Sequence, residues 1–253
     1  MLRKRLIPIL TIINYGLYKT TKFKNPSYIG DPINAIKIFN EKEVDELLVV
    51  DMGIAKRKSK NINYSYLESF ANECRMPLSY GGSVMSTQEA EKIFSLGYEK
   101  ISINSANFES RNLLYELAKQ FGSQSIVCSV DIKKSFFGEY KIYDSYNYKS
   151  VNCPVNNYLK SLEDSGAGEI IVTDIDREGT LKGPSTNFLN SVCADEINIP
   201  LVYNGGVSSL EEFEIVLESG YDACCAGAWF VYSGPHKAVI ISYPYYDEIK
   251  NLD

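Results

Sequence analysis

The sequence predicts a (β/α)₈ barrel, in which eight parallel strands alternate with helices. Three observations carry this prediction. Short β-branched runs alternate with longer amphipathic segments, and eight such runs occur. Several segments recur at an offset close to 123 residues. The length of 253 residues and the content of 45% hydrophobic and 23% charged residues suit one globular barrel.

Each expected strand is a short apolar run, and each expected helix is an amphipathic segment that follows one. The strands are predicted at residues 6–12, 46–51, 77–80, 100–104, 126–132, 169–174, 200–203 and 223–226. The helices are predicted at residues 32–42, 64–74, 87–96, 110–121, 154–165, 187–193 and 209–219. Asp31 before Pro32, and Ser209 before Glu211 and Glu212, are typical helix starts. The tyrosine-rich segment 136–150 predicts a hairpin inserted after the fifth strand.

An internal repeat supports closure of the barrel. Residues 45–51 match 168–174, residues 80–84 match 203–207, and residues 96–100 match 219–223. Agreement at three separate places indicates duplication of one unit. We therefore predict a single (β/α)₈ domain over residues 1–253, made of two (β/α)₄ half-repeats at about 1–123 and 124–253.

Composition excludes several functional classes. The 26 Lys and Arg residues against 32 Asp and Glu residues give a net charge of −6, so neither nucleic acid nor an anionic membrane is an expected partner. No apolar run approaches the roughly 18–20 residues of a membrane span. The short apolar stretch near the N-terminus predicts a buried strand rather than a signal peptide. Six cysteines without metal-binding spacing and one histidine, His236, predict reduced thiols, no metal, no cofactor and a cytoplasmic location.

Two Gly-Gly turns, at Gly81-Gly82 and Gly205-Gly206, follow the third and seventh strands. In a (β/α)₈ barrel these turns lie at the mouth, where backbone N–H groups can hold a phosphate. The alternative is that the glycines only make tight turns. Two such turns at equivalent positions of the repeat favour two phosphate sites on opposite sides of the mouth.

Asp131 ends the fifth strand, and Thr11 is its approximate counterpart at the end of the first. A carboxylate that points into the mouth can act as a general acid or base, or it can be a structural charge paired with a neighbouring lysine such as Lys133.

Lys19 lies in a loop over residues 16–23 that is long enough to fold over the mouth. It can hold an anionic substrate there or be a solvated loop charge.

Four charged residues stand at the starts of strands one, two, four and six: Arg5, Glu46, Lys100 and Glu169. Charges at the bottom of alternate strands can meet around the barrel axis as a ring. Such a ring is either a stabilising plug or a gate for a small molecule.

The chain resembles the cyclase subunit of imidazole glycerol phosphate synthase along essentially its full length. The residues that carry the resemblance are Lys4-Arg5, 30–32 (Gly-Asp-Pro), 45–47 (Asp-Glu-Leu), 102–104 (Ser-Ile-Asn), 121–124 (Phe-Gly-Ser-Gln), 166–170 (Gly-Ala-Gly-Glu-Ile) and 175–180 (Ile-Asp-Arg-Glu-Gly-Thr). The resemblance implies a (β/α)₈ barrel that forms a heterodimer with a glutaminase subunit docked at the barrel bottom. It also implies that ammonia passes through the ring to the mouth, which favours the gate over the plug.

The resemblance further assigns roles at the mouth. One phosphate is expected at Ser83, Asn104 and Ser105, and the other at Gly179, Gly206, Gly227 and Ala228. The family uses two catalytic aspartates. Asp131 fills one place, but Thr11 replaces the other, and a threonine hydroxyl cannot act as a carboxylate acid or base. Ser83 in place of a glycine and Ala228 in place of a serine also alter the two phosphate sites.

This combination resembles a cyclase-like branch encoded with surface-polysaccharide genes, through residues 23–26, 33–47 and 234–239. The branch is implicated in converting a sugar N-acetyl group to an acetamidino group for lipopolysaccharide, capsule or flagellar glycan. The resemblance implies an ammonia-dependent synthase or lyase subunit of a glutamine amidotransferase system, acting on a sugar or sugar phosphate. An ATP-dependent N-acetyl sugar amidotransferase is a further expected partner, since this chain has no ATP motif. The alternatives are a genuine cyclase of histidine biosynthesis and a non-catalytic scaffold that conducts ammonia.

Overall fold

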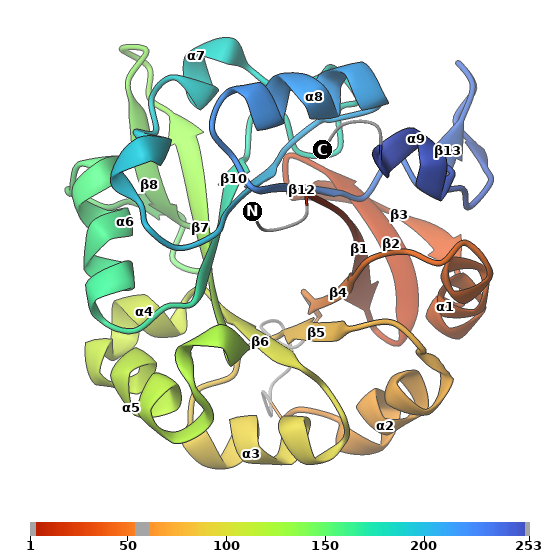
Figure 1. The fold of residues 1–253 in the computed structure, drawn as a ribbon, viewed down its shortest axis with the longest axis horizontal. Helices are drawn as coiled ribbons and strands as arrows, with labels where there is room; N and C mark the ends of the chain where they lie inside the picture. The colour runs from red at the N-terminus through yellow and green to blue at the C-terminus, as the bar shows by residue number, and fades with distance from the viewer. Residues whose placement is uncertain (1–3, 54–60, 251–253) are drawn as a thin grey trace.

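The computed structural model describes residues 4–53 and 61–250. Eight parallel strands form a closed barrel, as the sequence predicts (Figure 1). They are β1 (Arg5–Ile13), β4 (Leu47–Asp51), β5 (Leu78–Gly81), β6 (Lys100–Ile103), β7 (Ile126–Lys134), β10 (Glu169–Asp174), β11 (Leu201–Asn204) and β12 (Ala223–Ala226). The last strand pairs with the first, with Arg5 opposite Ala223, and β7 pairs with β10, so the barrel has no open edge.

Helices surround the barrel on its outside (Figure 1). The longer ones are α1 (Pro32–Glu41), α2 (Tyr64–Glu73), α3 (Thr87–Ser95), α5 (Arg111–Phe121), α6 (Val155–Asp164) and α8 (Leu210–Glu218). The shorter ones are α4 (Ala106–Glu109), α7 (Thr186–Leu189) and α9 (Tyr246–Lys250). No helix of the described part of the chain is long and apolar enough to span a membrane.

Helix starts follow the predicted capping chemistry. The Asp31 side chain accepts a hydrogen bond from the Ile33 N–H, and Pro32 is the first helical residue. Ser86 and Ser209, which the 123-residue offset relates, each accept from the N–H three residues later. This likeness agrees with the half-repeat interpretation, which stays a prediction.

The predicted helix over residues 187–193 was wrong in its extent. Ser185 caps α7 by accepting from the Phe188 N–H, so the helix begins at Thr186 and ends at Leu189. The Cys193 N–H donates to the side-chain oxygen of Asn156, which fixes this stretch outside a helix, and a 3₁₀ turn follows over Ala194–Glu196.

Two apolar layers hold the fold together. The larger layer lies between barrel and helices and includes the fully buried Phe39, Phe70 and Phe213. The smaller lies inside the barrel and consists of Ile7, Leu48, Val127, Ile171, Val202, Ala223 and Cys225. The barrel is therefore packed across its middle, and polar groups gather at its two ends.

Two hairpins extend from the barrel strands. The segment predicted as a loop over residues 16–23 is part of a hairpin of β2 (Gly16–Thr21) and β3 (Lys24–Gly30), because β2 pairs antiparallel with β1. The predicted insertion after the fifth strand is confirmed as β8 (Tyr140–Asp144) and β9 (Lys149–Ser150), which extend β7. A small third hairpin joins β13 (Tyr232–Ser233) and β14 (Ala238–Val239).

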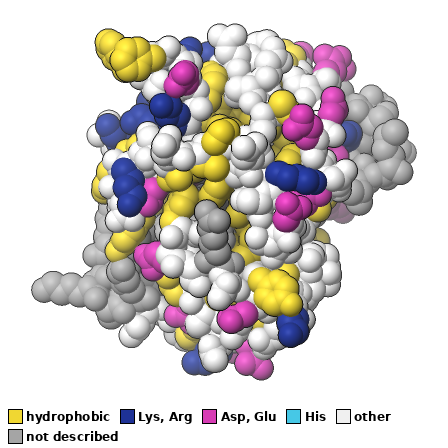
Figure 2. All heavy atoms as spheres, turned by 90° about the vertical axis from the view of Figure 1, so that its left-hand side faces the viewer, with side chains coloured by type: hydrophobic (Ala, Val, Ile, Leu, Met, Phe, Trp, Pro, Cys, Tyr) yellow, Lys and Arg dark blue, Asp and Glu magenta, His cyan; other side chains and the backbone are white. Residues whose placement is uncertain are grey.

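On the face that Figure 2 shows, acidic and basic side chains are interspersed rather than gathered into a patch of one charge.

Candidate active site

The four predicted ring residues meet in one ion-pair network inside the barrel. Arg5 contacts Glu46 and Glu169, each at 2.7 Å. Lys100 contacts the same two carboxylates at 2.9 and 3.2 Å. Each charge therefore has two partners of opposite sign, and the two glutamates are buried. The structure brings these residues together as a closed ring.

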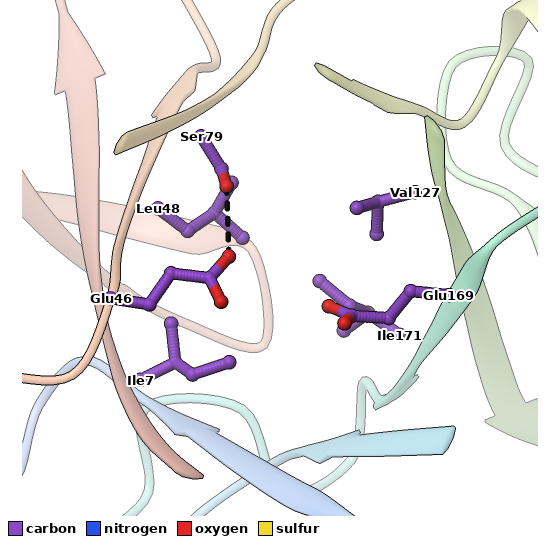
Figure 3. Close-up of a pocket in the computed structure, with 7 residues that line it drawn as sticks. All are labelled: Ile7, Glu46, Leu48, Ser79, Val127, Glu169 and Ile171. Carbon is purple, nitrogen blue, oxygen red and sulfur yellow. Dashed lines mark hydrogen bonds between the residues drawn. The ribbon is translucent and has the colours of Figure 1, made fainter. Parts of the chain in front are cut away.

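Ser79 is a fifth member that the sequence analysis missed. Its hydroxyl donates to Glu46 at 2.9 Å (Figure 3). Burial alone would raise the pKa of Glu46, but Lys100 and Arg5 outweigh it, so the pKa lies below its ordinary value.

An apolar layer stands above the ring, and Figure 3 shows its side chains pointing toward the centre of the barrel. The narrow space there is lined by Glu46, Ser79 and Glu169 together with Ile7, Leu48, Val127 and Ile171, and it has no room for a water molecule. The described side chains therefore leave no open passage at this end of the barrel.

A cavity of about 630 Å³ opens at the other end of the barrel. Of the mouth residues that the sequence analysis named, Gly205 does not line this cavity. Those that line it are Thr11, Lys19, Gly81, Gly82, Ser83, Asn104, Ser105, Asp131, Gly179, Gly206, Gly227 and Ala228. Leu48 and Ile171 line both this cavity and the narrow space above the ring. Ring, apolar layer and mouth cavity therefore follow one another along the barrel.

Asp131 is buried in the wall of the mouth cavity. One of its oxygens accepts from Asn104 Nδ2 at 3.0 Å and from the Ser145 hydroxyl at 2.6 Å. Burial raises the pKa of Asp131 to about 6, although both hydrogen bonds oppose the rise. The predicted alternative of pairing with Lys133 was wrong, because the Lys133 ammonium lies over the ring of Tyr143, 4.8 Å from its centroid. Asp131 can therefore exchange a proton near neutral pH.

Thr11 is buried at the mouth end of β1, opposite Tyr18 of β2. Among the described residues, the other carboxylates that line the cavity are Asp51 and Glu178. Asp51 accepts from the Gly53 N–H at 2.9 Å and so stabilises a turn. No lining carboxylate comes from β1, where the sequence has threonine.

The β2–β3 hairpin is tied to the loop after β10. Glu178 accepts from the Thr20 hydroxyl at 2.9 Å and from the Phe23 N–H at 2.8 Å, and its carbonyl accepts from Lys22 at 3.0 Å. A Cβ at Gly179 would lie only 2.0 Å from the Thr20 carbonyl oxygen. Only glycine allows this close approach, so Gly179 has a packing role besides any role in phosphate binding.

Lys19 projects from this hairpin into the mouth. Its side chain is buried, and its ammonium donates to the Ile9 carbonyl of β1. The predicted alternative of a solvated loop charge was therefore wrong. Burial lowers the pKa of Lys19 to about 8, and the opposing effect of Glu178 is smaller.

The two predicted phosphate sites differ in backbone strain. Gly206 has a φ of +77°, and Ser83, which the repeat offset relates to it, has a φ of +50°. Serine adopts this left-handed conformation at a cost that glycine does not have. Both Gly-Gly turns also serve packing, since Tyr80 donates to the Gly82 carbonyl and Tyr203 to the Gly205 carbonyl.

Several lining residues escaped the sequence analysis: Phe23, Ser145, Tyr146, Tyr148 and Glu178. They lie on the two hairpins and on the loop after β10. The tyrosine-rich composition of the inserted hairpin was a usable signal for the aromatic lining. The described residues contain no group of three or more His, Cys, Asp or Glu side chains that could hold a metal ion.

Fold and site together define a (β/α)₈ barrel with a charged ring at one end and a buried, protonatable carboxyl group in the mouth at the other. Residues 5–237 match the family described as "Histidine biosynthesis protein". The chain belongs to this family, and within it to the group of HisF-type subunits.

Relatives match over nearly the whole chain. A protein of Pseudomonas aeruginosa named "Putative imidazole glycerol phosphate synthase subunit hisF2" is 41% identical, over 100% of this chain and 99% of its own length. One of Leptospira interrogans, "Putative imidazole glycerol phosphate synthase subunit HisF", is 41% identical over 96% of each chain. "Imidazole glycerol phosphate synthase subunit HisF" of Oceanobacillus iheyensis is 32% identical over 92% of this chain and 91% of its own.

Proposed function

We propose that this chain receives ammonia from a glutaminase and uses it to convert a sugar N-acetyl group to an acetamidino group for a surface glycan. The observation that carries the proposal is Thr11. It stands where the resemblance calls for a catalytic aspartate, while Asp131 and the ring are intact. The charged ring proposed to conduct ammonia is thus present at one end of the barrel. The acid–base pair of the mouth, at the other end, lacks one carboxylate.

The ring and the apolar layer support ammonia delivery. A charged ammonium would lose its hydration on entering the layer of Ile7, Leu48, Val127 and Ile171, whereas neutral ammonia enters at far lower cost. The glutaminase is proposed to dock at the end of the barrel that carries the ring. Opening of the ring would then admit ammonia only when glutamine is hydrolysed.

The lining of the mouth supports a carbohydrate substrate. Hydroxyl and amide groups of Ser105, Ser129, Thr173 and Asn204 offer donors and acceptors to sugar hydroxyls. The aromatic side chains on the hairpins offer flat apolar faces. Ammonia displaces an amide oxygen only after that oxygen is activated. A separate ATP-dependent N-acetyl sugar amidotransferase is therefore the proposed source of the activated amide.

The second candidate is a cyclase of histidine biosynthesis. The names of the relatives favour it, and so does a mouth with two possible phosphate sites. Thr11 disfavours it, because loss of one acid or base commonly removes a factor of about 10²–10⁴ in rate.

A third candidate, a scaffold that only conducts ammonia, requires no chemistry at Asp131.

The test combines binding and turnover. The chain and the glutaminase encoded nearest to its gene are run together in gel filtration, and failure to co-elute at micromolar concentration would count against ammonia transfer. Turnover is then measured with ammonium salt and without glutaminase, on the activated acetamido sugar and on the bisphosphate substrate of the cyclase. An amidino product supports the proposal, an imidazole product supports the cyclase, and no product from either supports the scaffold.

A further inference from the structure

We propose that Lys19 is the second proton-transfer residue of the mouth, and that its amine accepts the proton that ammonia gives up when it bonds to the substrate. The inference rests on the proposed function for the identity of the reaction. The position and ionisation of Lys19 do not depend on it.

Lys19 lies beside the strand that lacks the expected carboxylate. Its amine reaches across from β2 to the Ile9 carbonyl of β1. Ile9 and Thr11 are two residues apart on β1, so their side chains point to the same face, and both line the mouth cavity. The amine therefore bonds the backbone of β1 two residues before Thr11, in a cavity that Thr11 also lines. A Cβ built on Gly227 would lie 2.6 Å from the amine, which places the group at the cavity wall.

The surroundings of Lys19 make the neutral amine, which can take up a proton, more accessible near neutral pH than it is in an exposed lysine. The titratable side chains that line the same cavity are Asp51, Asp131, Glu178, Tyr146 and Tyr148. Glu178 is the carboxylate that acts on Lys19, but its oxygens already accept from Thr20 and Phe23. No described carboxylate forms a salt bridge with Lys19. Burial therefore dominates and lowers the pKa of Lys19 to about 8.

The hairpin holds the amine in place. Three hydrogen bonds join Glu178 to residues 20–23, directly after Lys19. A proton acceptor must be positioned within hydrogen-bond reach of its donor, and a free loop would not keep it there. The hydrogen bond from the amine to the Ile9 carbonyl leaves the lone pair of the neutral amine free to face the cavity.

The proposed step balances as follows. The nitrogen of ammonia bonds to the carbon of an activated imidate, R–N=C(OX)–CH₃, and the electron pair of the C=N bond moves to the sugar nitrogen. Lys19 takes one proton from the added nitrogen, and protonated Asp131 gives one to the sugar nitrogen. The C–O bond then breaks, XO⁻ leaves with the bonding pair, and an amidinium group remains. Lys19 and Asp131 return to their starting states by exchanging the proton through solvent.

The first experiment measures Lys19 itself. The full chain is labelled with isotope-enriched lysine, its side-chain signals are titrated by NMR, and the Lys19 signal is assigned by its absence in Lys19→Arg. We expect a midpoint near the value of about 8. In Thr11→Asp the midpoint should rise, because a carboxylate is then added to the cavity that holds the ammonium. A Lys19 midpoint of 10 or above in the unsubstituted chain would overturn the proposal.

The second experiment measures the reaction in the complete system of glutaminase, ATP-dependent amidotransferase and acetamido sugar. Lys19→Arg keeps the positive charge but cannot accept a proton, so product formation should fall by about 10²–10⁴. Lys22→Arg on the same hairpin is the matched control and should change little. Near-full activity of Lys19→Arg would show that the residue only holds an anion and would overturn the assignment. Absence of amidino product from the unsubstituted system would refute the proposed function instead, and the NMR titration would still decide on Lys19.

Discussion

Glu46→Gln is the most informative change in the ring. The Glu46 carboxylate contacts Arg5 at 2.7 Å, Lys100 at 2.9 Å and the Ser79 hydroxyl at 2.9 Å. The substitution keeps the shape but leaves two cations sharing Glu169 alone. Breaking a buried ion pair costs about 3–5 kcal/mol. Because Arg5 and Lys100 keep 21% and 18% of their side-chain surface exposed, we expect a smaller loss, about 2–3 kcal/mol. That loss corresponds to a fall in Tm of roughly 4–12 °C for a chain of this size.

The pH dependence of this loss follows from the pKa of Glu46, which the two cations hold below its ordinary value of 4.5. A depressed folded-state pKa stabilises the protein above the unfolded-state pKa. The stabilisation is lost as the pH falls through the lower, folded-state value. The Tm difference between Glu46→Gln and the unsubstituted protein should therefore be full at neutral pH and shrink in acid. Ser79→Ala, which removes one hydrogen bond to Glu46, is the control and should cost only about 1 kcal/mol.

The same variant separates gate from plug. If the ring meters ammonia, Glu46→Gln with the glutaminase should consume glutamine but form less product. Ammonium salt at high pH should restore much of the product, since free ammonia can enter from the mouth. Product per glutamine consumed and Tm are the two measurements. A lowered Tm with unchanged coupling would refute the gate, and an unchanged Tm would refute the stability reasoning.

Three further predictions concern the mouth. Asp131→Asn should abolish product formation, without rescue by ammonium. Since burial raises the pKa of Asp131 from 3.8 to about 6, the folded state disfavours the charge, and the substitution should stabilise the protein by about 3 kcal/mol above pH 7. Melting curves should show this gain shrink as the pH falls through about 6 and vanish below 3.8; a full gain that persists there would contradict the cause given. The unsubstituted chain should not rescue a histidine auxotroph that lacks its cyclase, whereas Thr11→Asp should gain activity; robust growth with the unsubstituted chain would overturn this expectation. Gly179→Ala should displace the β2–β3 hairpin, because the new Cβ meets the Thr20 carbonyl at a φ of +67°. Faster limited proteolysis within residues 16–30 is the readout, with Gly30→Ala, where a Cβ meets nothing, as the control.

Local sequence chemistry predicted most of the barrel. The strands β10 and β12 have the predicted bounds, because uninterrupted apolar runs between polar ends leave little choice of register. The Asp31 and Ser209 caps mark helix starts in the sequence and in the structure. The ring could be predicted because charges at strand starts are rare in a buried barrel and must meet around the axis.

Contacts between distant segments could not be predicted. The hairpin of β2 and β3 was expected as a loop; its pairing with β1 is local, but its tie to Glu178, 158 residues from Thr20, has no local signal. Ser145 meets Asp131 only because the inserted hairpin turns back over the mouth. The burial of Lys19, and with it the shift of its pKa, likewise follows from tertiary packing rather than from any local motif.

The path of the glutamine amide nitrogen tests the central claim most directly. The chain, its glutaminase, the ATP-dependent amidotransferase, an acetamido sugar and the bisphosphate substrate of the cyclase are incubated with glutamine whose amide carries heavy nitrogen. Mass spectrometry then locates the label. The account predicts labelled nitrogen in an amidino group on the sugar, at a yield that falls in Glu46→Gln. Label in imidazole glycerol phosphate, or only in free ammonium, would contradict it.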